Sequence, residues 1–221
     1  MKNKILLVIA LFISAINASA QQVSFGAGAG VTNYRISGQM AENLNQFLNF
    51  SNGIISTKPV TGFYAGGFAT VPVNENFSIE PGLYYSSKGY QMQGSYTVKD
   101  FSVLSANATA KLETNYIDVP VLLKANINGL QVFAGPQFSY LTNASLNTNA
   151  SVAGFTLLNS KSDVSSQFNK MDIGITGGIG YQLANGMRIT AAYDRGLSKV
   201  DAAKNMNSYN QGFKVGLGMR F

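Results

Sequence analysis

The end of the chain alternates strictly between two kinds of side chain. Odd positions from residue 213 to residue 221 are apolar, and the even positions between them are Lys, Gly, Gly and Arg. Successive side chains of a β-strand point to opposite faces, so this pattern predicts a strand with one apolar and one polar face. The alternation recurs at residues 23–33, 61–71, 77–87, 112–124, 130–140, 171–183 and 187–197. We therefore predict an all-β fold of eight strands, although Pro120 would normally demote the fourth segment.

The gaps between these segments alternate in length. Short gaps lie at residues 72–76, 125–129 and 184–186, and the last of them carries Asn185-Gly186, a signal for a tight hairpin. Long gaps lie at residues 37–59, 90–111, 141–167 and 198–211. An even-stranded meander with short turns at one end and long loops at the other is typical of an antiparallel up-and-down transmembrane β-barrel. A soluble lipocalin-like barrel or a β-sandwich is the alternative.

The charged residues favour the membrane barrel. Within the predicted strands they share the face opposite the apolar series, and most other positions on that face of the first and last strands are Gly, Ser or Thr. A surface facing water would be crowded with Lys and Glu, whereas a narrow barrel interior needs small residues beside large ones. We expect Tyr64, Phe68, Tyr84 and Phe133 to point inward, together with Lys88. The predicted charge network of the lumen comprises Glu80, Asp118, Lys124, Asp172, Arg188, Asp194, Lys214 and Arg220.

These inward charges must pair, because a buried charge without a partner is costly. Lys214 is expected to pair with Asp172 or with Asp194. A structural network that fills a narrow lumen is the favoured interpretation, and a gated pore or proton path is the alternative.

Aromatic residues mark two levels along the predicted strands. One belt consists of Phe25, Phe77, Tyr181 and Phe221, and the other of Phe63, Tyr85, Phe138, Tyr140, Tyr193 and Phe213. Two such belts around an aliphatic band are typical of a barrel that crosses both interfaces of a bilayer. Arg35, Glu113 and Arg195 break the alternation, and we interpret them as residues at the rim beside the long loops. A slipped register is the competing interpretation.

The first twenty residues are expected to be a secretory signal peptide, with the barrel domain at residues 21–221. Lys2 and Lys4 precede an apolar run from Ile5 to Ile16, which is too short for a membrane helix. Ala18 and Ala20 form an A-x-A cleavage site.

Composition restricts the chemistry of the chain. Among its 221 residues there is no His and no Cys, which removes the commonest general base and the thiolate metal ligand. We therefore predict a protein that is not an enzyme and holds no metal and no cofactor. The Gly-rich stretch at residues 26–30 lacks the following helix that a phosphate-binding loop requires. The net charge of +6 is thinly spread, and no nucleic-acid partner is expected.

Several segments resemble known outer-membrane proteins. The C-terminal residues Phe213, Val215, Leu217, Met219 and Phe221 resemble the targeting signal of outer-membrane barrels, which implies recognition by the barrel-insertion machinery. Residues 77–89 and 115–124, with Gly135-Pro136 and Asp172-Ile173-Gly174, resemble the PorT-like porin family. This resemblance implies an eight-stranded barrel, OmpA/OmpX-like in size, in the outer membrane of a Gram-negative bacterium. One PorT-like member assists protein secretion.

The predicted function is accordingly non-catalytic. We expect an integral outer-membrane protein with a structural or surface-interaction role, including a secretion accessory, and a narrow pore or transporter for small solutes is the alternative. The barrel is expected to be embedded in the lipid bilayer, which is therefore one of its partners. A protein or ligand partner is expected at the long outer loops, which are rich in Asn, Ser, Thr and Ala. Met40, Leu44, Phe47 and Leu48 have the spacing of a short amphipathic helix in the first loop.

Overall fold

The computed structural model describes residues 23–39, 46, 55–98, 101–152, 155–203 and 207–221. The predicted signal peptide at residues 1–20 lies outside the described residues, as does the helix expected around Met40, Leu44, Phe47 and Leu48. The elements are β1 (Ser24–Gly38), β2 (Ile55–Pro72), β3 (Phe77–Val98), β4 (Phe101–Ile127), β5 (Leu130–Val152), β6 (Phe155–Asp163), a 3-10 turn η1 (Ser165–Gln167), β7 (Met171–Gln182), β8 (Met187–Gly196) and β9 (Ser208–Arg220). No helix among the described residues is long and apolar enough to cross a membrane.

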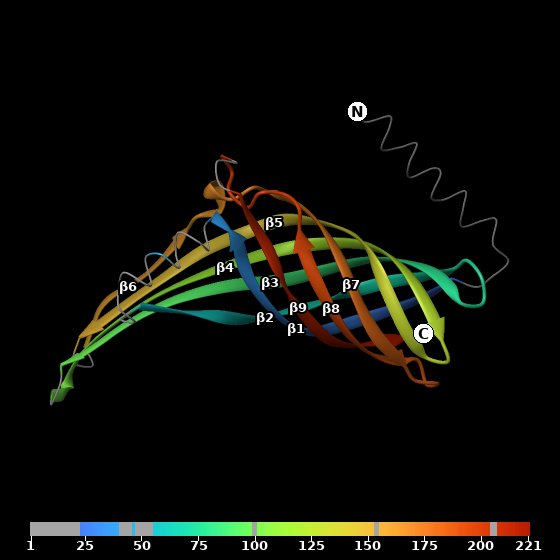
Figure 1. Ribbon diagram of the computed structural model, residues 1–221, viewed down its shortest axis with the longest axis horizontal. Coiled ribbons are helices and arrows are strands. Elements are labelled where there is room, and N and C mark those ends of the chain that lie inside the picture. The colour runs from blue at the N-terminus through green and yellow to red at the C-terminus, as the bar shows by residue number, and fades with distance from the viewer. Residues whose placement is uncertain (1–22, 40–45, 47–54, 99–100, 153–154, 204–206) are drawn as a thin grey trace.

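Eight of the strands close into an antiparallel ring. The sheet runs in the order β4-β3-β2-β1-β9-β8-β7-β5, and β4 also pairs with β5, which joins the two ends. The first and last strands therefore lie side by side, with Ala29 opposite Leu217. β6 is the one strand of the described chain outside the ring, and it pairs with the far end of β5 (Figure 1). The prediction of an eight-stranded up-and-down barrel is confirmed.

Short turns join the strands at one end of the barrel. Gly186 has a φ of +87° between β7 and β8, which fits the tight turn predicted from Asn185-Gly186. Asn128 and Gly129 have φ values of 52° and 88° between β4 and β5, as a type I′ hairpin requires. Both chain ends of the barrel lie at this end, which is the periplasmic end by the rule that short turns face the periplasm.

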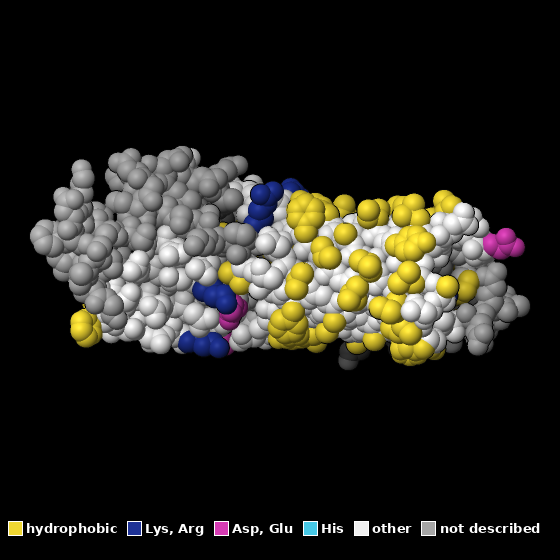
Figure 2. Space-filling view, turned by 90° about the horizontal axis from the view of Figure 1, so that it is seen from below, with side chains coloured by type: hydrophobic (Ala, Val, Ile, Leu, Met, Phe, Trp, Pro, Cys, Tyr) yellow, Lys and Arg dark blue, Asp and Glu magenta, His cyan; other side chains and the backbone are white. Residues whose placement is uncertain are grey.

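Exposed apolar side chains from all eight barrel strands form a band on the outer face, and Figure 2 shows one side of it. Residues of both predicted aromatic belts are exposed on the outer face, from Phe25 and Phe77 at the periplasmic end to Phe63 and Phe138 at the other. Aliphatic side chains such as Leu217 lie exposed between the belts. The band ends where Lys and Arg side chains begin on the face that Figure 2 shows. The outward face is therefore suited to lipid.

Large aromatic side chains fill the interior because glycines face them. A Cβ atom on Gly26 would lie 2.1 Å from the ring of Phe68, and one on Gly216 would lie 2.1 Å from the hydroxyl of Tyr64. Pro120 is buried inside β4, where the register with β3 passes from Pro81–Val121 directly to Tyr84–Asp118. Its position shows that a break in the ladder accommodates a proline within a barrel strand.

Two of the predicted long loops are wrong. Residues 90–98 belong to β3 and residues 101–111 to β4, and the two strands pair from Tyr90–Leu112 to Thr97–Ser105. Residues 141–152 are the end of β5, residues 155–163 form β6, and η1 follows at Ser165–Gln167. In β5, residues 146–152 are exposed or half-exposed on both faces, so the apolar–polar alternation that identifies a half-buried strand is absent there. At about 3.3 Å per residue, β3 continues for roughly 25–30 Å past Tyr90.

We predict that Leu217→Arg prevents efficient folding into bilayers. Leu217 is exposed to lipid halfway between Phe213 and Phe221, and a cation near the bilayer midplane costs about 2–4 kcal/mol. Leu130→Arg is the matched control, because Leu130 is equally outward but begins β5 at the periplasmic end, where the cost is about 0–1 kcal/mol. Urea unfolding in lipid vesicles measures both. Equal losses for the two variants would contradict the assigned membrane depth.

Candidate functional site

The lower lumen holds one buried carboxylate between two cations. Glu80 from β3 accepts hydrogen bonds from the Lys124 ammonium of β4 at 2.9 Å and from the Arg188 guanidinium of β8 at 2.7 Å. Thr70 adds a third hydrogen bond to the same carboxylate, at 3.2 Å. The guanidinium of Arg188 lies 3.6 Å from the ring centroid of Phe68. The structure thus brings together three of the predicted residues across the width of the barrel.

The middle of the lumen is organised around Asp194. The Lys214 ammonium lies 2.8 Å from this carboxylate, which also accepts hydrogen bonds from the Tyr34 hydroxyl and from Gln137. Lys214 therefore pairs with Asp194 and not with Asp172, the other partner that the sequence allowed. Asp172 instead accepts hydrogen bonds from Ser198 at 2.7 Å and from Asn210 at 2.8 Å.

The upper lumen contains a cation that the predicted network omitted. Lys88 is 3% exposed and lies 3.5 Å from Asp118, which also accepts a hydrogen bond from Ser86 at 2.6 Å. The Lys88 ammonium lies over the rings of Tyr34 and Tyr116, at 4.9 Å and 4.3 Å from their centroids. Strand alternation places all these side chains on the inward face, but it does not give the register that makes Lys88 the centre of the layer.

Arg220 lies at the periplasmic mouth of the lumen. Its side chain is exposed there, and with the Gln182 amide oxygen turned toward it, the guanidinium donates hydrogen bonds to Gln182 at 3.1 and 3.2 Å. Gln131 and Gln182, which hydrogen-bond each other at 2.8 Å, are the innermost polar pair near that mouth. The other seven predicted charges are buried or half-buried in the lumen.

An apolar cluster closes the opposite mouth. Its buried members are Tyr116, Leu141, Ala144 and Val164, and Leu112, Leu146 and Phe168 pack against them. The segment around η1 is held over the barrel by backbone hydrogen bonds from Val164 to Ala144 and from Ala202 to Gln167, both at 2.9 Å. Phe168 and Val200 line the space directly above Lys88.

The space left inside the barrel is divided. A cavity with a volume of about 60 Å³, room for roughly four waters, lies among Glu80, Asp118, Arg188 and Lys214. Two others of about 20 and 10 Å³ lie around Lys88, below the apolar cluster. The described residues contain no cluster of acidic side chains suited to a metal ion. The lumen geometry is that of a cross-linked interior with small gaps.

We predict that Glu80→Gln destabilises the barrel by about 3–5 kcal/mol, because Lys124 and Arg188 are then buried without a counter-charge. Adding Lys124→Met to that variant should recover part of the loss, since the two residues are coupled. Glu113→Gln is the control, because the exposed Lys111–Glu113 pair contributes only about 0–1 kcal/mol. Urea unfolding in vesicles gives the three free energies. A loss for Glu80→Gln no larger than the control would refute the network.

Solved structures provide distant comparisons. The chain is 13% identical to Ail, the attachment invasion locus protein of Yersinia pestis, crystallised with the heparin analogue sucrose octasulfate, over 91% of this chain and 100% of that one, with a TM-score of 0.45. Neisserial surface protein A is 12% identical over 91% and 100% of the chains, with a TM-score of 0.44. The outer membrane protease OmpT of Escherichia coli is 12% identical over 90% and 95%, with a TM-score of 0.40.

Comparison with protein families identifies one for this chain. No curated protein matches the sequence. The family model described as "Outer membrane protein beta-barrel domain" matches residues 19–202, which is most of the chain. That match agrees with the closed ring, the apolar band and the two aromatic belts. This chain is thus an outer-membrane β-barrel protein and belongs to the outer membrane protein beta-barrel domain family.

Proposed function

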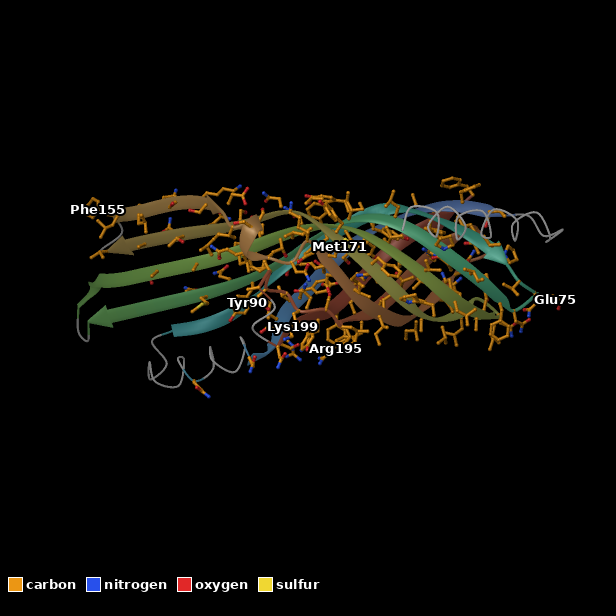
Figure 3. The ribbon with its side chains drawn as sticks, turned by 90° about the horizontal axis from the view of Figure 1, so that it is seen from above. Glu75, Tyr90, Phe155, Met171, Arg195 and Lys199 are labelled. Atoms are coloured by element: carbon orange, nitrogen blue, oxygen red, sulfur yellow. The ribbon has the colours of Figure 1, made fainter. Side chains whose placement is uncertain are left out.

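We propose that this protein is a non-catalytic surface-interaction protein, and that it binds an extended strand of a partner protein at the free edge of β6. The filled lumen supports a structural role for the barrel, which carries the sheet formed by the outer ends of β2, β3, β4 and β5 together with β6. Figure 3 shows Phe155 at one end of the long molecule and Glu75, beside the periplasmic turns, at the other. The partner-binding element is therefore far from the membrane.

The exposed edge of β6 is the observation that carries this proposal. All nine residues of β6 are exposed, and no described strand pairs with its second edge. Unpaired backbone N–H and C=O groups along such an edge are a template for another strand. Phe155 and Leu157 are 75% and 70% exposed, and Val152 and Leu158 are exposed beside them. Apolar side chains gathered outside the membrane band are typical of a protein-binding site.

Edge strands that avoid partners usually carry charge or proline. In β6 the apolar residues occupy the first half of the strand, and its charges, Lys161 and Asp163, lie in the second half toward the barrel. The Ser165 side-chain and backbone hydrogen bonds hold the pKa of Asp163 below its usual value, so this carboxylate is charged at neutral pH. A partner strand paired with β6 would thus contact apolar side chains at the end far from the membrane and charged side chains at the end near it.

The same proposal includes a secretion role, an export signal and a targeting signal, each of which is supported by a sequence pattern. The PorT-like resemblance favours a secretion accessory in a Gram-negative cell as one form of surface interaction. The signal peptide, with cleavage after Ala20, is the proposed route of export. The C-terminal residues from Phe213 to Phe221 are the proposed signal for the barrel-insertion machinery, and the outer-membrane level of a chain lacking Phe221 is the measurement that tests it.

The filled lumen predicts no conductance. We expect the purified protein in planar bilayers to show no stable openings at neutral pH, because the layers around Glu80, Asp194 and Lys88 cross the lumen below an apolar cluster. A large porin in the same bilayers serves as the positive control. Reproducible stable openings would instead favour the pore that the sequence left as an alternative.

The edge of β6 predicts a periodic pattern of crosslinks. Because the chain has no Cys, single cysteines at Asn159, Ser160, Lys161 and Ser162 can each carry a photo-crosslinker on intact cells. A partner strand paired with β6 should give adducts to one protein whose yield alternates with a period of two residues. Leu157→Lys with Leu158→Lys should reduce the yield at least about tenfold, because added charges oppose strand addition.

The control for this experiment places the same two charges elsewhere on β6. Thr156→Lys with Ser162→Lys, measured with the probes at Asn159, Ser160 and Lys161, leaves the apolar residues in place, and we expect it to retain more of the adduct than the leucine variant. Adducts without periodicity, or an equal loss in both double variants, would refute strand addition.

A further inference from the structure

Two arginines on the outer face of the barrel stand in one row across three strands. Arg35 of β1 is the register partner of Gln211 of β9, and Arg195 of β8 is the partner of the same glutamine from the other side. We call Arg35, Gln211 and Arg195 the arginine row. Both arginine side chains are exposed. At about 4.8 Å per strand spacing, the two arginine Cα atoms are roughly 10 Å apart.

The arginine row lies directly beyond the membrane band. Two residues nearer the periplasm on each strand, Asn33, Phe213 and Tyr193 form the next outward row, and the rings of Tyr193 and Phe213 pack with centroids 4.9 Å apart. One row further down are Val31, Val215 and Ala191. Each step of two residues is about 6–7 Å along the strand. The sequence of apolar, aromatic and cationic rows places the arginines at the depth of lipid headgroups.

The arginine row is arranged so that an anion can bind to it, because Gln211 holds one of the two arginines in place. Gln211 is only 7% exposed, although it faces outward, because its side-chain oxygen accepts hydrogen bonds from the Arg195 guanidinium and from the Tyr193 hydroxyl, the latter at 3.2 Å. Gln211 thereby fixes Arg195 above the aromatic belt. The row contains no carboxylate, so no negative charge within it balances the two guanidinium groups.

Several other cations of the described chain have a carboxylate partner, whereas the arginine row has none. Lys111 on the extension has Glu113 at 2.5 Å, and the described lumen pairs join Lys88, Lys124, Arg188 and Lys214 to carboxylates. Neither Arg35 nor Arg195 is within 4.0 Å of a carboxylate among the described residues. Guanidinium groups match the geometry of phosphate oxygens and bind them with paired, charge-assisted hydrogen bonds.

We propose that the arginine row binds the phosphate group of an anionic lipid headgroup in the outer leaflet. Arg35 and Arg195 supply the two guanidinium groups, Gln211 positions Arg195, and Phe213 with Tyr193 contacts the upper part of the acyl chains. A free phosphate offers the same oxygens, but it would leave the aromatic row below without a ligand. This site is independent of the proposed partner strand at β6.

Tryptophan fluorescence can measure this preference. The chain contains no Trp, so Phe213→Trp gives a single reporter below the row. The reporter protein is folded into phosphatidylcholine vesicles, and its quenching is compared for brominated phosphatidic acid, brominated phosphatidylcholine and brominated diacylglycerol. We expect phosphatidic acid to bind about tenfold more tightly than the other two. Arg35→Gln with Arg195→Gln should reduce the ratio to about twofold or less.

The controls separate a site from general attraction and from free phosphate. Lys161→Gln with Lys170→Gln removes the same charge from two exposed lysines outside the row and should keep the tenfold ratio. Inorganic phosphate at 10 mM should not displace phosphatidic acid. Equal binding of phosphatidic acid and diacylglycerol, an equal loss in both double variants, or displacement by inorganic phosphate would each overturn the proposal. Urea unfolding of all variants verifies that they are folded.

Discussion

Closure of the sheet is the constraint from which the other features of this barrel follow. Hydrocarbon offers no hydrogen bonds to backbone groups, so a sheet inside a bilayer must have no edge. Here the edge is removed by pairing β1 with β9 and β4 with β5, and β6 joins only where β5 has already left the apolar band. The membrane therefore dictates a closed ring, and the open edge is confined to the aqueous side.

An eight-stranded ring is narrow, and its width determines the interior chemistry. Side chains fill a barrel of this size, so each large residue requires a small one opposite it, as Tyr64 requires Gly216. The polar groups that line such an interior must satisfy one another. Glu80 of β3 accepts a hydrogen bond from Arg188 of β8, and Lys214 of β9 donates one to Gln137 of β5 at 3.0 Å, so both contacts connect strands that are not neighbours in the ring. The charges therefore act as cross-links between opposite walls.

The sequence predicts those features that follow from the difference between the two environments of a strand, lipid on one face and the lumen on the other. Apolar against polar alternation identifies all eight barrel strands and the inward faces of Glu80, Asp194 and Lys214, because lipid and lumen differ sharply. Alternation does not determine register, so it could not choose between Asp172 and Asp194 as the partner of Lys214, nor identify the layer around Lys88. Alternation also places Arg220 on the inward face, but it does not give the depth of Arg220, which contacts Gln182 at the mouth of the lumen because the strand ends there.

The same reasoning explains why the extension was predicted as loops, and what its composition implies. Where water contacts both faces of a sheet, no boundary enforces alternation, and the outer part of β5 can consist of Asn, Ser, Thr and Ala. Apolar residues have no lipid to face there, yet Phe155, Leu157 and Leu158 return at the start of β6. Burial in this chain cannot account for them, since all three are exposed. Exposed apolar side chains on an unpaired edge cost solubility, so a surface that buries them in a complex is the physical reason for their presence that fits the fold.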